Sequence, residues 1–288
     1  MMNFQSQNFE KNRGFLPKKK ETIDPRAEEA RRGRLLEESF INRPYSKTEV
    51  EADLARVNRR RTEYRNVDTV RGREQKRTAD LFEKLVLRNF NKALWMGSGA
   101  VAIKTSEFDD YFNSVDLVVE FSGEQSPSHL GLAADVTFSS NRAEIAEKFD
   151  SLRNKIKRGT LSEVKYFRSE ETGYSGPLDH LPEVVIGVSQ RTVLELERLQ
   201  AEKKYKELEE HRAGILILKE IEIQLIVLEK YAQSMRQFNA ALIYSDRLAI
   251  IRGILAKKAE LVAQVEKEGV TDPVYWEIMK TMENWSRY

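Results

Sequence analysis

The stretch 108–140 reads FDDYFNSVDLVVEFSGEQSPSHLGLAADVTFSS. It contains two apolar runs, 114–121 and 130–138, which the polar sequence SGEQSPSH separates. Short apolar runs on either side of a segment with Gly, Pro and Ser predict two strands joined as a hairpin. Each predicted strand also carries a carboxylate, Asp116 in the first and Asp135 in the second.

These two carboxylates are the unusual feature of the hairpin. Successive strand residues face opposite sides, so Asp116 shares a face with Val118 and Glu120. Asp135 shares a face with Thr137 for the same reason. A carboxylate inside a strand is costly to bury unless it is paired, protonated or bound to a metal. Two of them on adjacent strands therefore predict convergence on one cation.

The sequence around the hairpin alternates between helix and strand patterns. An amphipathic helix is predicted over 78–91 with Thr78 as its N-cap, and a helix over 141–158 with Ser139 or Ser140 as its cap. The order from 78 to 188 is helix, three strands, helix, two strands, which predicts an α/β core with a mixed sheet flanked by helices. The predicted strands outside the hairpin are 100–105, 163–167 and 183–188, with a polar loop between the last two and the last one central in the sheet.

The N-terminal part of the chain is basic. Residues 1–77 contain 20 Lys and Arg against 13 Asp and Glu, a net charge of +7. Helices are predicted over 26–42 and 47–65, the second opened by the capping-box pair Ser46 and Glu49. The basic run 56–77 has two interpretations: a solvated helical surface with salt bridges, or an arm that contacts the phosphates of nucleic acid.

The C-terminal part is almost wholly helical in pattern. Helices are predicted over 189–211, 212–234 and 238–268, followed by a short docking helix with two tryptophans. Helices this apolar need partners. We favour packing against each other as a hairpin, and association with a second copy or a protein partner is the alternative. The predicted segments of the chain are a basic arm at 1–77, an α/β core at 78–190 and a helical hairpin at 191–288.

Composition excludes several classes of site. There is no cysteine, so disulfides, thiolate zinc sites and a Cys nucleophile are excluded. This composition fits a cytoplasmic location. No stretch reaches 18 uncharged apolar residues, so no membrane span is predicted.

With helix, strands and acids in this order, the segment resembles the PD-(D/E)XK nuclease-like core, a restriction-endonuclease-like fold. The resemblance implies Mg²⁺-dependent hydrolysis of nucleic-acid phosphodiester bonds. It also implies that Glu83 on the first helix, Asp116 at the second strand and Asp135 on the third bind the metal. The segments SVDLVVEF, AADVTFSS, VKYF and VVIGV are further similar to segments in proteins of candidate-phyla bacteria, over roughly residues 78–265. That second similarity brings no function with it.

One position departs from the pattern that the resemblance implies. The family has a lysine two residues after the last acid, and this chain has Thr137 there. Lys148 on the following helix and Lys104 on the first strand are the candidates to replace it. If neither does, the core is an inactive nuclease-like fold that serves in nucleic-acid binding or assembly. Three further residues, Asp109, Asp110 and Glu120, are additional candidate ligands, although surface or turn positions are the favoured interpretation for them.

Overall fold

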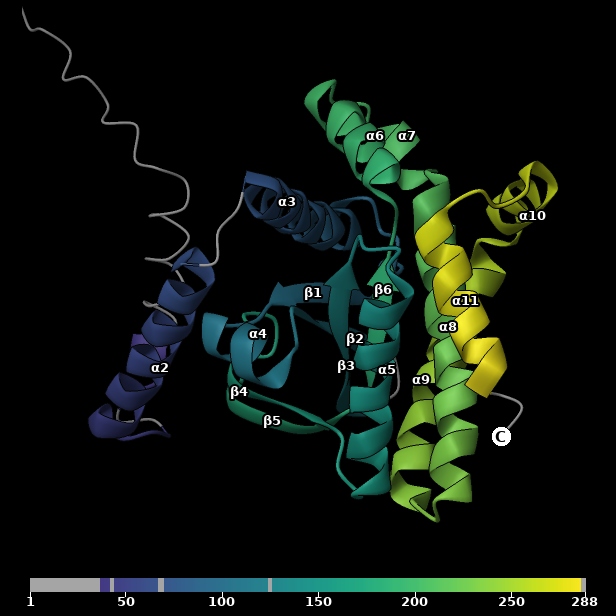
Figure 1. The fold of residues 1–288 in the computed structure, drawn as a ribbon. Coiled ribbons are helices and arrows are strands. Elements are labelled where there is room, and N and C mark those ends of the chain that lie inside the picture. Colours follow the sequence, from purple (N-terminus) through teal and green to yellow (C-terminus); the bar gives the residue numbers. More distant parts are fainter. Residues whose placement is uncertain (1–36, 42–43, 67–69, 124–125, 286–288) are drawn as a thin grey trace, which may run out of the picture.

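The computed structural model describes residues 37–41, 44–66, 70–123 and 126–285. Its centre is a four-stranded sheet in which neighbours follow the order β1-β2-β3-β6 (Figure 1). The pairs β1–β2 and β2–β3 are antiparallel, and the pair β3–β6 is parallel. The strands are β1 (Ala100–Lys104), β2 (Leu117–Gly123), β3 (Ser126–Thr137) and β6 (Glu183–Gly187). The predicted α/β class, with a mixed sheet and flanking helices, is confirmed.

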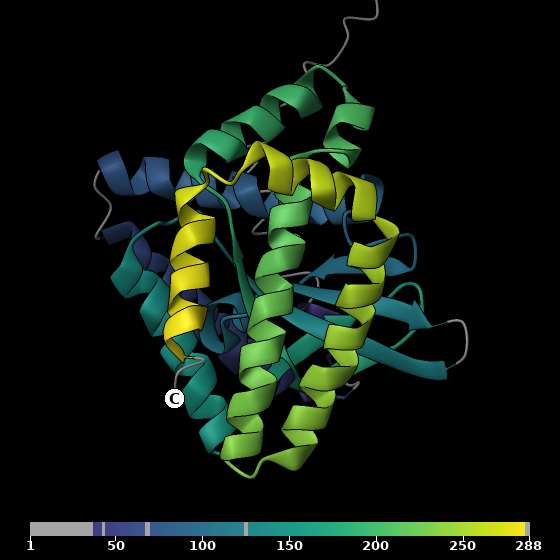
Figure 2. The same cartoon turned by 90° about the vertical axis from the view of Figure 1, so that its right-hand side faces the viewer.

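Helices surround this sheet on several sides (Figure 1). The α2 helix lies at the outer left of that view, and the short α4 helix lies between α2 and the sheet. The long helices α8 and α9 run side by side as a hairpin next to α11 (Figure 2). The helices are α2 (Lys47–Asn66), α3 (Val70–Lys92), α4 (Glu107–Asn113), α5 (Arg142–Lys157), α6 (Gln190–Ala201), α7 (Tyr205–Glu209), α8 (Arg212–Ser234), α9 (Phe238–Lys257), α10 (Ala259–Glu268) and α11 (Pro273–Trp285).

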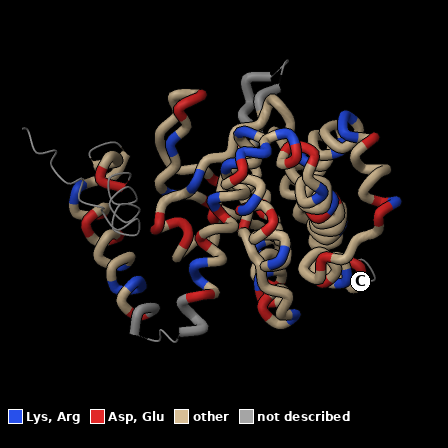
Figure 3. Tube along the Cα trace, turned by 90° about the horizontal axis from the view of Figure 1, so that it is seen from above, with Lys and Arg blue, Asp and Glu red and all other residues tan. Residues whose placement is uncertain are grey.

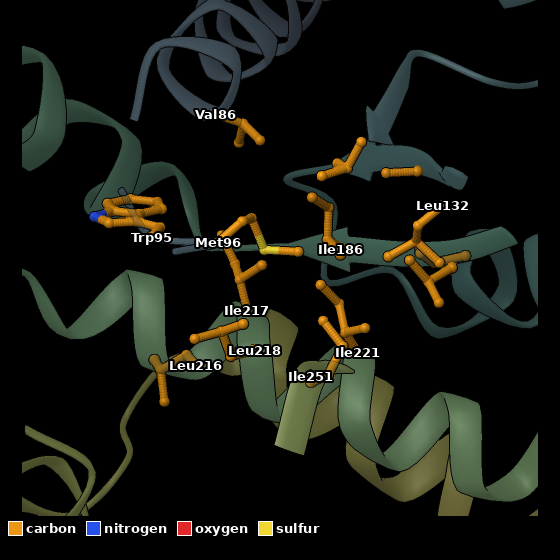
Figure 4. Close-up of a cluster of buried hydrophobic side chains, with 14 of the residues drawn as sticks. Val86, Trp95, Met96, Leu132, Ile186, Leu216, Ile217, Leu218, Ile221 and Ile251 are labelled. Atoms are coloured by element: carbon orange, nitrogen blue, oxygen red, sulfur yellow. The ribbon is translucent and has the colours of Figure 1, made fainter. Parts of the chain in front are cut away.

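Strand alternation divides the interior into two layers. Leu132 and Ala134 of β3 belong to the main core, whereas Ala133 between them belongs to a small second cluster on the other face. The main core continues from the sheet into α8 and α9, where Ile217, Ile221 and other apolar side chains pack toward β6 (Figure 4). One core therefore joins the sheet to the C-terminal helices.

The second face of the sheet is covered by a separate two-stranded sheet. It consists of β4 (Ser162–Arg168) and β5 (Ser175–Leu181), which pair antiparallel. The predicted polar loop after residue 167 is therefore wrong, because its second half forms β5. Only Gly176 and Leu181 of β5 are buried, so an edge strand with so many exposed residues reads as a loop in the sequence.

The hairpin strands reach further into the turn than predicted, although β2 begins at Leu117, three residues after its predicted start. β2 reaches Gly123 and β3 starts at Ser126, so most of the predicted turn SGEQSPSH is strand. Inter-strand pairing continues past the apolar runs because the ladder needs backbone groups rather than apolar side chains. The sequence also missed the short α4 helix, which occupies the region before β2.

The prediction that 183–188 is a central strand is wrong, since β6 is the last strand in the order. It is apolar because all five of its residues are buried, and side chains of α8 cover its open edge. The Gln224 side chain of α8 accepts a hydrogen bond from the Val185 N–H at 2.8 Å and donates one to the Val185 carbonyl at 2.7 Å. Glu220 accepts from the Gly187 N–H at 2.9 Å. These side chains satisfy the open edge of β6 much as another strand would.

Several helix ends differ from prediction. α3 begins at Val70, so Thr78 lies inside the helix, and its hydroxyl donates to the Glu74 carbonyl. The N-cap of α5 is Asn141, whose side chain accepts from the Ala143 N–H, so the expected serine caps are wrong. The predicted helix 189–211 breaks before α7, where Lys203 has a φ of 57°. The predicted helix 238–268 divides at Lys258 into α9 and α10.

The remaining predictions concern the N-terminal helix, the segment boundaries, the C-terminal helix and membrane spans. The predicted helix 26–42 lies mostly outside the described residues. The division at residues 77 and 190 stays a prediction, although α3 runs unbroken through the first boundary. The C-terminal helix docks as expected, with the rings of Trp285 and Phe149 5.7 Å apart. Among the described residues, no helix is long and apolar enough to cross a membrane.

Candidate acidic site at the end of the sheet

The β2–β3 pairing brings Asp116 and Asp135 together. Leu117 is opposite Ala134 in the register, so Asp116, one residue earlier, is opposite Asp135, one residue later. The backbone N–H of Asp116 donates to the Ala134 carbonyl at 3.1 Å. One Asp116 carboxylate oxygen accepts a hydrogen bond from the Val136 N–H at 2.7 Å. The two acids that the hairpin sequence singled out therefore lie side by side at one end of the sheet.

Two more acids reach the same place from helices. Glu83 comes from α3, and its carboxylate lies 3.1 Å from the Lys104 ammonium at the end of β1. Asp110 comes from α4, the helix that the sequence did not predict, and its carboxyl group lies close enough to Asp116 for each to affect the pKa of the other. Four carboxylates from two helices and two strands thus form one cluster, which we call the acidic site: Glu83, Asp110, Asp116 and Asp135.

Lys148 of α5 faces this cluster. Its ammonium lies 2.5 and 2.6 Å from the two carboxylate oxygens of Asp135. About 31% of the Lys148 side chain is exposed, against 10% for Asp135, so the lysine stands between solvent and the acid. Burial opposes the charge on Lys148, but the charge and hydrogen bonds of Asp135, together with the charges of Asp116 and Glu183, outweigh burial and raise the lysine pKa. Lys148 is therefore a cation at neutral pH and not a base.

Burial and mutual repulsion dominate the electrostatics of the acids. Burial raises the pKa of Asp116 well above its usual value, and the charges of Asp135, Asp110 and Glu83 raise it further. Burial, followed by the charge of Glu83, raises the pKa of Asp110 to about 7. Burial also raises the pKa of Asp135, although the Lys148 charge opposes this. An added cation would relieve this repulsion.

The donor set suits a hard divalent cation, since Mg²⁺ binds carboxylate oxygens and keeps several waters. As the side chains stand, however, no group of three or more His, Cys, Asp or Glu within the described ranges is arranged to hold a metal ion. Lys148 occupies both oxygens of Asp135, and the Val136 N–H occupies one oxygen of Asp116. Metal binding by Asp116 and Asp135 would therefore require Lys148 to move aside.

The position that departs from the nuclease pattern has a local role. Thr137 is buried, and its hydroxyl accepts a hydrogen bond from the Ser139 N–H at 3.2 Å. It supplies no charge to the acidic site. Of the two lysines expected to replace the missing one, Lys148 contacts Asp135, whereas Lys104 contacts Glu83. The structure thus places both lysines at the cluster, on different acids.

Interpreting Asp109 and Glu120 as surface or turn residues is wrong, whereas Asp110 is half-buried on α4. Asp109 is fully buried and accepts four hydrogen bonds. Glu120 is also buried and accepts from the Ser169 hydroxyl at 2.7 Å. The signal that could have revealed this was Ser106, which caps α4 and accepts from the Asp109 N–H. A seven-residue helix is too short for apolar periodicity to predict.

The basic segment 56–77 is only partly available to a phosphate. The Arg56 guanidinium lies 4.3 Å from the centre of the Phe112 ring, and Arg61 pairs with Glu107. Arg59 is exposed on α2, as is Arg77 on α3. Seen from above, acidic and basic positions are mixed along α2 (Figure 3). The side chains of the middle of the segment, 64–73, lie outside the described residues.

Comparisons of the chain with protein-family models, with curated proteins and with solved structures found no match.

Proposed function

We propose that this protein hydrolyses phosphodiester bonds of nucleic acid with the help of Mg²⁺ at the acidic site. The single observation that carries the proposal is the convergence of four carboxylates and two lysines at one end of the sheet. Apart from the interposed α4, β4 and β5, the order α3, β1, β2, β3, α5, β6 agrees with the restriction-endonuclease-like core that the sequence resembles. Clusters of acids that repel one another inside a protein are costly, and they are frequent at functional sites.

Each residue of the acidic site would have a separate role in hydrolysis. Asp116 and Asp135 would hold Mg²⁺, with Glu83 and Asp110 adding negative charge beside them. When bound, the metal would neutralise charge on the phosphate and lower the pKa of a bound water. Lys148 carries a positive charge and reaches solvent, so after leaving Asp135 it would orient the water and stabilise charge that develops on the phosphate. Lys104 is half-exposed beside Glu83 and would contact the same phosphate group.

A second function is favoured by a different observation. The contact of Lys148 with both Asp135 oxygens already compensates that carboxylate without a metal. The presence of Thr137 in place of the usual lysine also favours an inactive core. In this alternative the nuclease-like core is inactive and serves as a nucleic-acid-binding or assembly protein, with α2 or the C-terminal helices as its contact surface. A cytoplasmic location and a partner for those helices stay predictions from the sequence.

The test combines metal binding with cleavage. Calorimetry with Mg²⁺ and Mn²⁺ on the purified chain, with and without oligonucleotide, measures binding, because substrate phosphate can complete a Mg²⁺ site. Cleavage is then followed on labelled single- and double-stranded DNA and RNA. We expect Asp135→Ala and Asp116→Ala to lose metal binding and to lower cleavage by at least 100-fold, as removal of a central ligand does.

The matched control is Asp150→Asn, a carboxylate on the same helix as Lys148 whose side chain is 63% exposed. It should bind metal and cleave as the parent chain does. If the parent chain binds no divalent cation even with oligonucleotide present, the hydrolytic function is wrong. If Asp135→Ala then also leaves oligonucleotide affinity unchanged, the inactive alternative is the better one.

A further inference from the structure

We infer that the docking of α2 against α4 positions Asp110 in the acidic site, so that the basic arm and the site are mechanically coupled. This inference rests on the proposed function insofar as it treats Asp110 as part of a metal site. It goes beyond that function because it assigns a positioning role to residues of α2 and β4 that touch none of the four acids. The contacts run from α2 through β4 to α4.

The first contact joins α2 to β4. The Lys165 ammonium of β4 lies 2.8 Å from Glu49 and 2.7 Å from Asp53, both on α2. The Tyr166 hydroxyl also donates to Asp53 at 2.9 Å. Asp53 is buried, so its two bonds are charge-assisted and partly shielded from solvent, which makes them stronger than surface pairs, whereas Glu49 is exposed. The Lys165 ammonium further lies 4.7 Å from the centre of the Tyr45 ring.

The second contact joins the same two β4 residues to α4. Their backbone N–H groups both donate to Asp109, from Lys165 at 2.7 Å and from Tyr166 at 3.0 Å. The side chain of Asn113, one turn further along α4, also donates to Asp109 at 2.7 Å. Lys165 and Tyr166 therefore bind α2 with their side chains and α4 with their backbone.

The third contact joins α2 to α4 directly. Arg56 stacks over Phe112 of α4, and Arg61 pairs with Glu107 at its start. Val50 and Val57 of α2 share an apolar cluster with side chains of α4 and β4. The α4 helix has only seven residues, too few to be stable without packing. Its other face presents Asp110 to Asp116, so whatever fixes α4 also fixes Asp110.

The arrangement gives the basic arm a second role. Nucleic acid that binds the exposed side of α2 could shift this helix. Because α2 contacts β4 and α4, such a shift would change the position of Asp110 in the acidic site. Loss of that docking would leave Asp116, Asp135 and Glu83 in place, because β2, β3 and α3 hold them. It would release only Asp110. The expected consequence is weaker metal affinity without loss of the site.

A double-mutant cycle tests this coupling. Tyr166→Phe keeps the ring in its apolar cluster and removes the hydroxyl bond to Asp53, and Asp53→Asn weakens the docking further. Each is measured alone and combined with Asp110→Asn, by Mg²⁺ calorimetry and by hydrogen exchange of the peptide 106–114. We expect Asp53→Asn to weaken Mg²⁺ binding about fivefold, as about 1 kcal/mol of coupling would. In the Asp110→Asn background it should have no further effect.

The control is Glu51→Gln on the exposed side of α2, which should change neither readout. Hydrogen exchange separates this inference from the proposed function, because it needs no metal. If no cation binds but Asp53→Asn and Tyr166→Phe still speed exchange in 106–114, the hydrolytic function fails and the positioning of α4 by α2 stands. If exchange in 106–114 does not change, or if the loss of affinity is equal in both backgrounds, the positioning role is wrong.

Discussion

Asp109 and Asp110 are neighbours on the α4 helix, yet their surroundings are opposite. Asp109 accepts hydrogen bonds from two backbone N–H groups of β4 and from the side chains of Ser106 and Asn113. Burial raises its pKa, and those four donors oppose the rise. Asp110 faces other acids, and burial together with the charge of Glu83 raises its pKa to about 7.

The difference shows how one short helix separates a structural carboxylate from a candidate functional one. A buried carboxylate with enough donors stabilises the fold that supplies them. A buried carboxylate beside like charges is held there by the rest of the fold at a cost in stability. Three substitutions test this comparison, ordered from the largest expected effect to the smallest.

The largest effect is expected from Asp109→Ala. It leaves the N–H groups of Lys165 and Tyr166 buried without acceptors and detaches α4 from β4. We expect the free energy of unfolding to fall by about 3 to 4 kcal/mol, because each unsatisfied buried donor costs about 1 to 3 kcal/mol. Urea unfolding measures this as a lower midpoint with an unchanged slope. A loss below about 1 kcal/mol would show that Asp109 is not a structural carboxylate.

The next effect concerns Glu37, a buried carboxylate on the same side of α4 with too few donors. One of its oxygens accepts from the Phe108 N–H at 3.1 Å, and the other has no partner among the residues that the structure describes. Burial raises its pKa from 4.5 to about 7. Between those pH values the folded chain binds more protons than the unfolded chain, so Glu37 makes the free energy of unfolding fall as pH rises. Above about pH 7 its contribution is constant.

Glu37→Gln removes this pH-dependent contribution. At about pH 8 the variant should be more stable than the parent chain by about 3 kcal/mol, since one pKa unit corresponds to about 1.4 kcal/mol. Near pH 4.5 the two should be alike. Thermal unfolding across this pH range compares them. Equal pH dependence of parent and variant would mean that Glu37 titrates normally.

The smallest effect is expected from Asp110→Asn. This change keeps the size of the side chain and removes one charge from the acidic site. At about pH 8, without divalent cations, the free energy of unfolding should rise by about 1 kcal/mol, because repulsion within the cluster decreases. Asp150→Asn on the exposed face of α5 is the comparison and should change stability by less than about 0.5 kcal/mol. Destabilisation by Asp110→Asn would place Asp110 with Asp109 as a structural residue.

Most of the regular structure was determined by local pattern. The apolar stripe Ile145, Phe149, Leu152 and Ile156 predicted α5, and all four side chains are buried. The apolar runs around Asp116 and Asp135 predicted β2 and β3, and with them the meeting of these two acids. Periodicity and alternation determine which face of an element is buried, so these features follow from the sequence by itself.

Other features were decided only by tertiary contacts. β6 carries the sequence of a central strand, but it lies at the edge because Gln224 and Glu220, far along the chain, satisfy its backbone. The short α4 helix has too few residues for a periodic signal and is held by Asp109 and by α2. Asp110 joins the acidic site through that packing. The sequence thus predicted Asp116 and Asp135 from its pattern and Glu83 from the resemblance. The tertiary structure decided the fourth acid, Asp110, because a seven-residue helix takes its position from its neighbours rather than from its own pattern.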